Sequence, residues 1–284
     1  MYATVRERLP RPTDRIQLGS AGVKVSPVCM GITGSPDTVL AAYEAGVNFF
    51  FLSADLHWPL YEHTREGLRR LLATKARRND VVVGVVSYLD EPLFSALQFH
   101  EVLDSVPGLE RVDVLIAGAV SSDASFYPRI RSLGAARAIA HCGARAIGAS
   151  FHQRPYVLMA DHHQLLDISF VRYNTAHPGA RNDIFPYVKV PRASKMFNFK
   201  SVLSCVPPET FRALGLPRSC WQPEVTDYYR FALSRPELDG VLCSPQTPQE
   251  LHGLCAALEK PPLSQEEQEY MIWLSMVAQS PVMA

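Results

Sequence analysis

The chain lacks an excess of charge of either sign. Among its 284 residues, lysine plus arginine and aspartate plus glutamate both total 28. Without a strong net field we do not expect nucleic acid or a membrane surface as the main partner. Long apolar runs are also missing, because runs such as Val81 to Val86 are far shorter than the roughly 20 residues of a membrane span. The beginning, MYATVRERLPRPTDR, has no signal-like apolar stretch, so we expect a cytoplasmic protein.

The sequence contains neither a C-x-x-C pair nor an H-E-x-x-H motif. Its six cysteines are scattered, which is typical of separate buried thiols in a reducing compartment and not of a disulfide framework or a zinc site. The nine histidines show no metal-ligand spacing on one helical face. We therefore expect no bound metal.

What the chain does contain is a regular alternation of apolar runs and amphipathic segments. Eight short runs rich in β-branched residues lie at 25–31, 47–53, 80–88, 112–120, 144–150, 165–174, 194–201 and 239–245. Helical patterns lie at 36–45, 60–74, 93–105, 128–142, 155–163, 223–235 and 247–259. Continuously apolar strands alternating with helices indicate a parallel sheet covered on both faces, and eight such units indicate an α/β protein with a closed (β/α)8 TIM barrel.

Local signals support this assignment and extend it to both ends. Gly46 and Gly143 stand where helices should end before the next strand. Residues 15–26 predict a β-hairpin able to cover the barrel floor, and Ser264 with Glu267 forms the capping box of an extra C-terminal helix. No linker divides the chain, so residues 1–284 are expected to form a single domain, although only one strand can be assigned within 175–222.

Several segments, taken in order, resemble the aldo-keto reductase family over nearly the full length of the chain. They are IQLGSAGVKVSPVCMG, AAYEAGVNFF, RAIGAS, VRYN and PQTPQELHGLCAALEKPPLSQEE, and VRYNTAHPGARNDIFP is similar to bacterial branches of the family. The resemblance implies an oxidoreductase on a TIM barrel with NAD or NADP as its cofactor.

The family's catalytic groups are missing at the matching positions. Its Asp, Tyr, Lys and His tetrad lies at the ends of barrel strands 2 to 4, and the Tyr donates the proton that accompanies hydride transfer. The resemblance places these four roles on Phe51, Leu56, Val86 and Gly118. We therefore expect a diverged member with a degenerate tetrad.

The residues that hold the nicotinamide cofactor in the family are also mostly replaced. Its Ser-Asn pair and Gln correspond to Ser150, Phe151 and Phe170. The turn after the last barrel strand has no arginine or lysine, although the helix N-terminus after Pro248 can bind an anion through backbone amides. The candidate cofactor contacts are Ser150, Ser244, Gln246 and Thr247.

Other polar residues lie at the ends of the barrel strands or just beyond them, an even number of positions after an inward-facing residue. Their side chains are therefore expected to face the same side. Active sites of such barrels lie at the carboxyl ends of the strands, so these residues are site candidates. The candidate catalytic residues are Asp55, His57, Tyr88 and Lys200. The candidate substrate-binding residues are Phe51, Trp58, His152, Phe170, Arg172 and Asn174.

Each group suggests a role and also has a purely structural alternative. An aspartate beside a histidine orients the imidazole for acid–base work, and Tyr88 can replace the missing phenol. Arg172 can donate two parallel hydrogen bonds to a carboxylate or phosphate, and Lys200 can pair with an anion or act as a nucleophile. Alternatively, Asp55 and His57 cap the following helix, Arg172 forms an ion pair, and the other side chains pack at the rim or extend into solvent.

Three functions remain open at this point. The first is an NAD(P)H-linked reductase of a carbonyl or imine in a small-molecule or peptide-derived substrate. The second is a redox-independent isomerase, cyclase, lyase or hydrolase in a biosynthetic tailoring pathway. The third is a non-catalytic barrel that binds a ligand or a partner. Apolar residues at the vacated positions favour an apolar or aromatic substrate.

Overall fold

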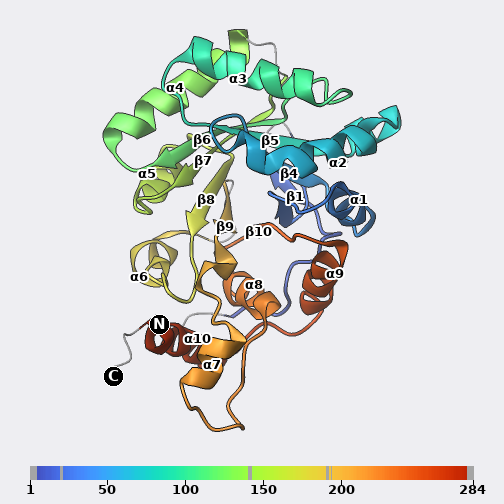
Figure 1. Ribbon diagram of the computed structural model, residues 1–284. Coiled ribbons are helices and arrows are strands. Elements are labelled where there is room, and N and C mark those ends of the chain that lie inside the picture. The colour runs from blue at the N-terminus through green and yellow to red at the C-terminus, as the bar shows by residue number, and fades with distance from the viewer. Residues whose placement is uncertain (1–4, 20–21, 140–142, 190–191, 193, 280–284) are drawn as a thin grey trace.

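The computed structural model describes residues 5–19, 22–139, 143–189, 192 and 194–279. Eight parallel strands close a barrel in the order β10-β3-β4-β5-β6-β7-β8-β9, which confirms the predicted (β/α)8 architecture (Figure 1). The barrel strands are β3 (Val28–Met30), β4 (Phe49–Ser53), β5 (Val82–Ser87), β6 (Val114–Val120), β7 (Ala146–Phe151), β8 (Ile168–Arg172), β9 (Lys195–Phe199) and β10 (Gly240–Cys243). Seven of them lie within a run predicted from the sequence, and β7 extends one residue beyond its run, to Phe151. The runs are visible because strands buried on both faces must be apolar throughout.

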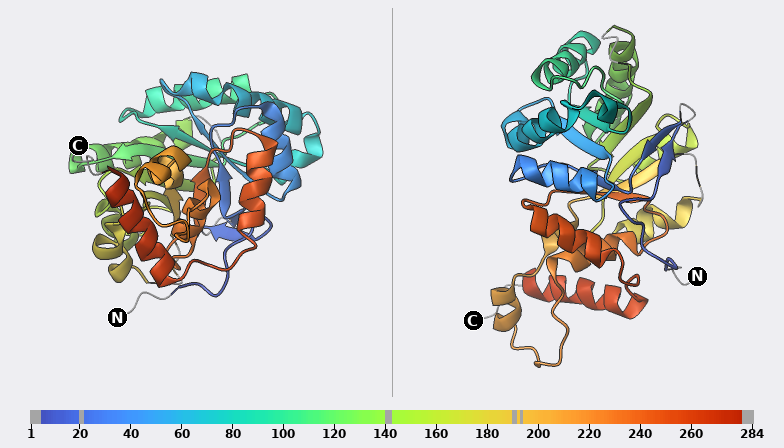
Figure 2. Two further views of the ribbon diagram at one scale, coloured as in Figure 1. Left: turned by 60° about the horizontal axis from the view of Figure 1, so that its bottom comes forward. Right: turned by 90° about the vertical axis from the view of Figure 1, so that its right-hand side faces the viewer.

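The helices surround the strand ring (Figures 1 and 2). The α-helices are α1 (Pro36–Glu44), α2 (Glu62–Leu72), α3 (Pro92–Ser105), α4 (Asp123–Ile139), α5 (Tyr156–His162), α6 (Ala180–Asp183), α7 (Pro208–Ala213), α8 (Val225–Leu233), α9 (Pro248–Ala257) and α10 (Gln265–Gln279). Short 3-10 helices are η1 (Trp58–Tyr61), η2 (Lys75–Asn79), η3 (Phe185–Tyr187) and η4 (Ser201–Ser204). The segment 175–222 thus holds several short helices besides β9.

Most of the local predictions hold. Gly46 has a φ of +97°, and a Cβ there would lie 2.7 Å from the Thr13 side chain, so a residue without a side chain is needed. Ser264 and Glu267 form the predicted capping box, with N–H to oxygen distances of 2.7 and 3.1 Å. One boundary was wrong: α4 begins at Asp123, with Pro128 inside it, and the predicted end at 142 lies outside the described residues.

A hairpin of β1 (Ile16–Leu18) and β2 (Val23–Val25) precedes the barrel, as predicted, and two of its turn residues lie outside the described part. The Asn48 side-chain amide donates to the Lys24 carbonyl of β2 at 2.9 Å. Because Asn48 comes directly before β4, this bond places the hairpin at the amino ends of the barrel strands.

Aromatic rings fill the barrel from floor to mouth. Phe49 meets Phe197 edge-on at 5.8 Å between ring centroids, Phe197 contacts Phe170 at 5.9 Å, and Phe170 contacts Phe51 at 5.6 Å. Phe49 and Phe51 both point inward because alternate residues of a strand face the same side. The interior is therefore packed, and its upper rings, Phe51 and Phe170, border an open space.

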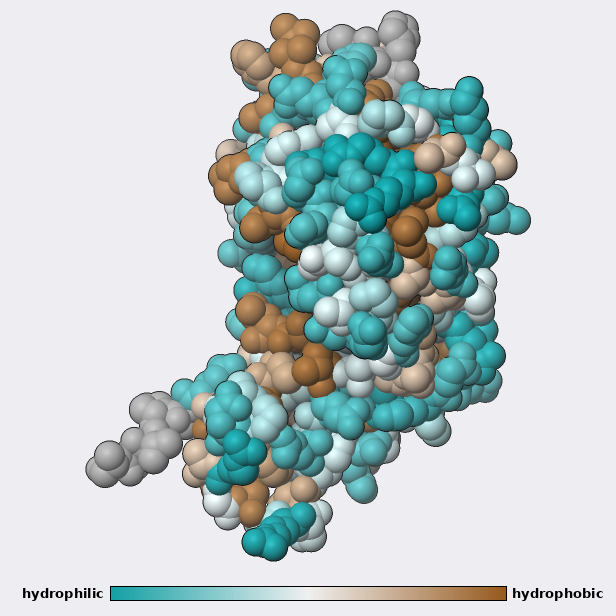
Figure 3. Space-filling model, turned by 45° about the vertical axis from the view of Figure 1, so that its right-hand side comes forward, coloured by the Kyte–Doolittle hydropathy of each residue, from teal (hydrophilic) through white to brown (hydrophobic). Residues whose placement is uncertain are grey.

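On the surface, apolar side chains gather at α3, where Leu93, Phe94 and Leu97 are each more than half exposed. Figure 3 shows hydrophobic atoms at the top of the molecule, where α3 and α4 lie, with hydrophilic side chains over most of the remaining face. Among the described residues, no helix combines the length and the apolar character needed to cross a bilayer.

Candidate functional site

A cavity of about 370 Å³, here called the mouth cavity, opens at the carboxyl ends of the barrel strands. Eight residues singled out from the sequence line it: Phe51, His57, Tyr88, Ser150, His152, Phe170, Lys200 and Ser244. Six further residues complete its wall: Tyr61, Phe199, Ser201, Val202, Tyr229 and Leu242. Of the remaining candidates, Asp55, Trp58, Arg172, Asn174, Gln246 and Thr247 are not part of the lining.

Asp55 and His57 form a hydrogen-bonded pair where the chain leaves β4. The His57 Nδ1 lies 3.0 Å from both carboxylate oxygens of Asp55, and the His57 backbone N–H donates to the same carboxylate at 3.0 Å. Ser53 donates a further bond from its hydroxyl. The carboxylate therefore stabilises the turn and also orients the imidazole, so the catalytic and structural interpretations are compatible.

Two phenols lie close to this pair. The Tyr88 ring centroid is 6.0 Å from that of His57, and the Tyr61 ring is 6.4 Å from that of Phe51. Burial raises the pKa of both phenols above the usual 10, with nearby Asp55 adding to the effect. Both therefore stay protonated at neutral pH and can donate a proton or a hydrogen bond.

A bulge in β6 makes room for Tyr88. The β6–β7 register shifts between Ala117 and Val120, and Ala119 adopts a left-handed φ of +49°. A Cβ on Gly118 would lie 2.5 Å from the Tyr88 ring, so glycine is required beneath that phenol. The Ser150 hydroxyl accepts from the Ala119 N–H at 2.9 Å and so holds the bulge in place.

Arginine, lysine and histidine side chains occupy the opposite side of the mouth, at the ends of β7, β8 and β9. Arg172 ends β8 opposite Phe199, and Lys200 follows directly after β9. Partial burial and then Lys200 and Arg172 lower the pKa of His152 below 6.5, and partial burial and then Arg172 lower that of His177. Both imidazoles are therefore neutral at pH 7, in a region of positive potential.

These two histidines predict a pH-dependent stability. Because their folded pKa values lie below 6.5, the unfolded chain binds more protons as the pH falls through that value, and the native state is destabilised. Arg172→Gln removes one repelling charge and should lessen this loss. Urea unfolding at about pH 7.5 and pH 5.5, with the exposed Lys75→Gln as control, measures the effect. An identical loss in wild type and Arg172→Gln would contradict it.

No family model matches the sequence, and no curated protein does. Among solved structures, the chain is similar to the holo form of an aldo-keto reductase from Bacillus halodurans, with a TM-score of 0.68 and 12% identity over 93% of this chain and 96% of that one. It is also similar to an aldo-keto reductase from a Medee basin deep-sea metagenome library, with a TM-score of 0.65 and 14% identity over 92% and 94%. The chain has the aldo-keto reductase fold. At such low identity the likeness lies in the fold, and the chemistry has to be argued from the site.

The residue that the resemblance placed at the family's tyrosine position is not part of the mouth-cavity lining. Leu56, which the sequence register matched to the family's tyrosine, is 82% exposed. Tyr61 instead lines the mouth cavity and is only 7% exposed, because η1 turns the chain back toward the barrel. A phenol is therefore present at the mouth, although no residue that the register matched to the tetrad supplies it. The resemblance did not point to Tyr61, because this residue lies ten positions after Phe51, whereas the matched position, Leu56, lies five after it.

The predicted phosphate end of the cofactor site does not fit a nicotinamide dinucleotide. The Glu250 carboxylate already accepts from the Gln246 N–H at 2.8 Å, and Thr247 accepts from the Glu250 N–H at 3.2 Å. The Gln246 side chain donates to its own turn at Ser244. The Glu250 carboxylate and the Thr247 hydroxyl thus occupy two of the backbone amides around the start of α9, and no arginine or lysine stands in this turn.

Trp58 and Asn174 have structural partners. The Arg65 guanidinium lies 3.7 Å from the Trp58 ring centroid and donates to the Trp58 carbonyl at 2.6 Å. Asn174 is fully buried, and its amide donates to the Lys200 carbonyl at 2.9 Å. Neither side chain is placed to contact a ligand in the mouth cavity directly.

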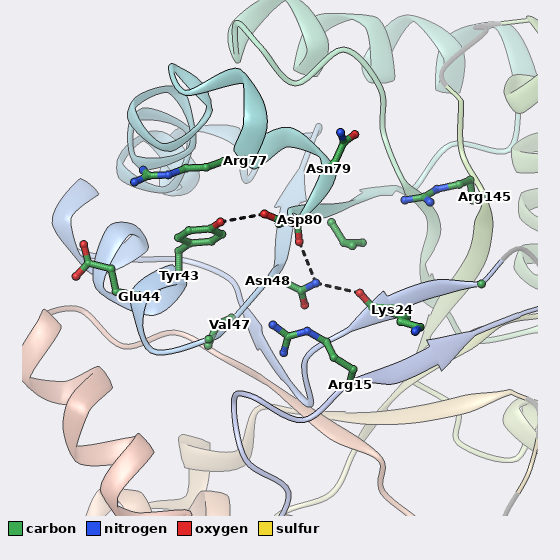
Figure 4. Close-up of a pocket in the computed structure, with 13 residues that line it drawn as sticks. Arg15, Lys24, Tyr43, Glu44, Val47, Asn48, Arg77, Asn79, Asp80 and Arg145 are labelled. Carbon is green, nitrogen blue, oxygen red and sulfur yellow. Dashed lines mark hydrogen bonds between the residues drawn. The ribbon is translucent and has the colours of Figure 1, made fainter.

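A larger cavity, of about 670 Å³, lies at the amino ends of the strands. Figure 4 shows Asn48 at its centre, bonded to the carbonyls of Lys24 and Asp80, with arginines from several elements around it. Residues at this end of a (β/α)8 barrel generally serve stability, and Asn48 uses its amide to connect hairpin and barrel.

The described residues contain no group of three or more histidines, cysteines or carboxylates arranged to hold a metal. The mouth cavity is therefore the candidate active site.

Proposed function

We propose that the protein is an enzyme that transfers protons at a carbonyl or imine group of a small molecule bound in the mouth cavity. The observation that carries this proposal is the Asp55–His57 pair, with its 3.0 Å contacts, beside two protonated phenols. A positioned imidazole and a positioned phenol are the groups that general base and general acid catalysis require.

In the proposed reaction His57 removes a proton from the carbon next to the carbonyl or imine. The electrons of the broken C–H bond form a C=C bond, and negative charge develops on the oxygen or nitrogen. A phenol of Tyr61 or Tyr88 donates a hydrogen bond or its proton to that atom. Return of the proton to the same carbon from the other face, or to the far carbon of a C=C bond conjugated with the enolate, completes an isomerisation, and no oxidant or reductant is consumed.

The apolar wall supports this chemistry. Phe51 and Phe170 form the floor of the cavity, and Phe199 stands on its side. Such a wall accepts an aromatic or branched aliphatic body and excludes water, so the remaining polar contacts are strengthened.

Nicotinamide-linked reduction is the second candidate. It is favoured by the likeness in fold to an aldo-keto reductase in its holo form and by Ser150 and Ser244, which line the cavity. A bound nicotinamide would supply the hydride for such a reduction. Against it stand the occupied amides at the start of α9.

Solvent-deuterium exchange tests the proposal. Small aldehydes, ketones and oxo acids are incubated with the protein in D2O without nicotinamide, and proton NMR follows loss of the C–H signal beside the carbonyl. We expect exchange above the protein-free rate, and a fall of about 100-fold for His57→Ala. The exposed His63→Ala, outside the cavity, should leave the rate unchanged.

Absence of exchange with every compound, or exchange that His57→Ala does not change, would overturn the proposal. A parallel titration with NADH and NADPH, followed by nicotinamide fluorescence, addresses the second candidate. Binding together with oxidation of the nicotinamide by a carbonyl compound would favour reduction instead.

A further inference from the structure

We propose that Arg172, His177, Lys200 and His152 form an anion subsite at the mouth, and that the ligand is therefore a carbonyl acid that bears a carboxylate or phosphate. This inference rests on the proposed function and names its substrate class. The four residues, here called the anion subsite, come from the ends of three adjacent strands, β7, β8 and β9.

The first support is the position of the four side chains. His152 and Lys200 both line the mouth cavity, across from the Asp55–His57 pair. Arg172 is half-buried at the end of β8, and both Arg172 and Lys200 act on the His152 and His177 imidazoles as nearby charges. The cationic groups therefore share one side of the opening that a ligand must enter.

The second support is the lack of an internal counter-ion. In the described part of the chain, no hydrogen bond or ion pair involves the charged groups of Arg172 and Lys200. Neighbouring arginines are paired: Arg154 holds Asp183 at 2.6 Å, and Arg181 holds Glu269. Arg172 ends β8 and Lys200 follows the neighbouring strand β9, so their positive charges repel each other, and a bound anion would offset this repulsion.

The third support is that buried amides hold the site in a defined geometry. Asn174 donates to the Lys200 carbonyl at 2.9 Å and accepts from the His177 N–H at 2.9 Å. Asn198, fully buried on β9, accepts from the Tyr173 N–H at 2.8 Å. Lys200 itself has a left-handed φ of +59°, a strained conformation for a residue with a side chain. Two Asn residues thus fix the ends of β8 and β9.

The chemistry of the ligand follows from the arrangement. A guanidinium fork and an ammonium bind planar or tetrahedral oxyanions, and the phenylalanine floor binds an apolar body. The acid–base pair lies across the same cavity. A small oxo acid with an aromatic or branched side chain, or its phosphate counterpart, satisfies all three features.

Binding measurements with matched probes test the inference. Isothermal titration compares phenylpyruvate with its uncharged methyl ester, and phenyl phosphate with phenol. We expect each anion to bind at least about tenfold more tightly than its neutral counterpart, and Arg172→Gln and Lys200→Gln each to weaken anion binding by about tenfold. Neither substitution should alter ester binding, and the exposed Lys75→Gln should change nothing.

Equal binding of acid and ester, or anion binding that both variants leave intact, would overturn the anion subsite. ADP and inorganic phosphate are titrated in separate experiments. If ADP binds with the same dependence on Arg172 and Lys200 while the organic acids do not, the subsite stands only as a nucleotide phosphate site, and the substrate class inferred here is overturned.

Failure of this inference and failure of the proposed function give different results. His57→Ala should lower the exchange rate by about 100-fold and retain binding of phenylpyruvate. Binding that depends on Arg172 without any exchange would overturn the proton-transfer function alone. Exchange that depends on His57 but is equal for acid and ester would overturn the anion subsite alone.

Discussion

Tyr61→Phe should lower the rate of deuterium exchange by about 100- to 10,000-fold. The side chain lies in the mouth cavity beside Phe51, at the top of the aromatic column that fills the barrel. Its pKa is raised by burial and by its neighbours Tyr88 and Asp55, so the phenol is protonated across the neutral range. Removing only the hydroxyl keeps the packing and deletes the proposed donor to the carbonyl oxygen.

Two further substitutions interpret that result. Tyr88→Phe should have a smaller effect, because Tyr88 lies between His57 and the β6 bulge, closer to the edge of the site. Tyr43→Phe, in the cavity at the barrel floor, is the matched control and should leave the rate unchanged. A larger loss for Tyr88→Phe than for Tyr61→Phe would move the donor assignment to Tyr88. Wild-type rates in both would refute a phenol donor.

Asp113→Ala should lower the free energy of unfolding by about 3–5 kcal/mol. This carboxylate is fully buried at the start of β6 and accepts from Arg78 at 2.9 Å, Arg111 at 3.0 Å and Arg145 at 3.3 Å. It also accepts from the Val83 N–H at 2.9 Å. Its removal leaves the Arg78 guanidinium, whose side chain is 4% exposed, without its carboxylate in the interior.

Urea unfolding measures this difference, with Asp113→Asn expected to lose less because it keeps an acceptor for Val83. Asp37→Ala provides an exposed comparison. It removes a 3.4 Å ion pair with Arg70 in which both side chains are largely in solvent, and should cost less than about 1 kcal/mol. A cost for Asp113→Ala no larger than that of Asp37→Ala would show that the buried cluster contributes little to stability.

The barrel strands could be predicted because their signal is local. A parallel strand covered on both faces has to be apolar along its whole length, as in the run from Val82 to Ser87. Capping residues such as Ser264 act on amides within one helical turn, so their role is also visible in the sequence. The start of α4 was missed because Pro128 usually marks the beginning of a helix, whereas here it lies inside one.

The candidate site was less accessible to sequence reasoning. The alternation of inward- and outward-facing residues after Phe51 and Phe170 pointed to Asp55, His57 and Arg172 as site candidates. These three residues lie where β4 and β8 end at the mouth. It did not identify Tyr61 or His177, because each reaches its place through a turn after the strand. The sequence signal available for Tyr61 was a tyrosine eight residues beyond the end of β4. That spacing does not match the position of the family's tyrosine.

The order of apolar and polar residues along the chain is sufficient to specify eight strands and most of the longer helices between them, since these follow from burial and from periods of two and 3.6 residues. The pairing of groups around the mouth is a different matter. The end of β8 at Arg172 lies beside Phe199 of β9, and Tyr88 packs over Gly118, only once the barrel closes and brings distant segments together. Closure depends on strand register across the whole ring, a non-local property that no short stretch of sequence encodes.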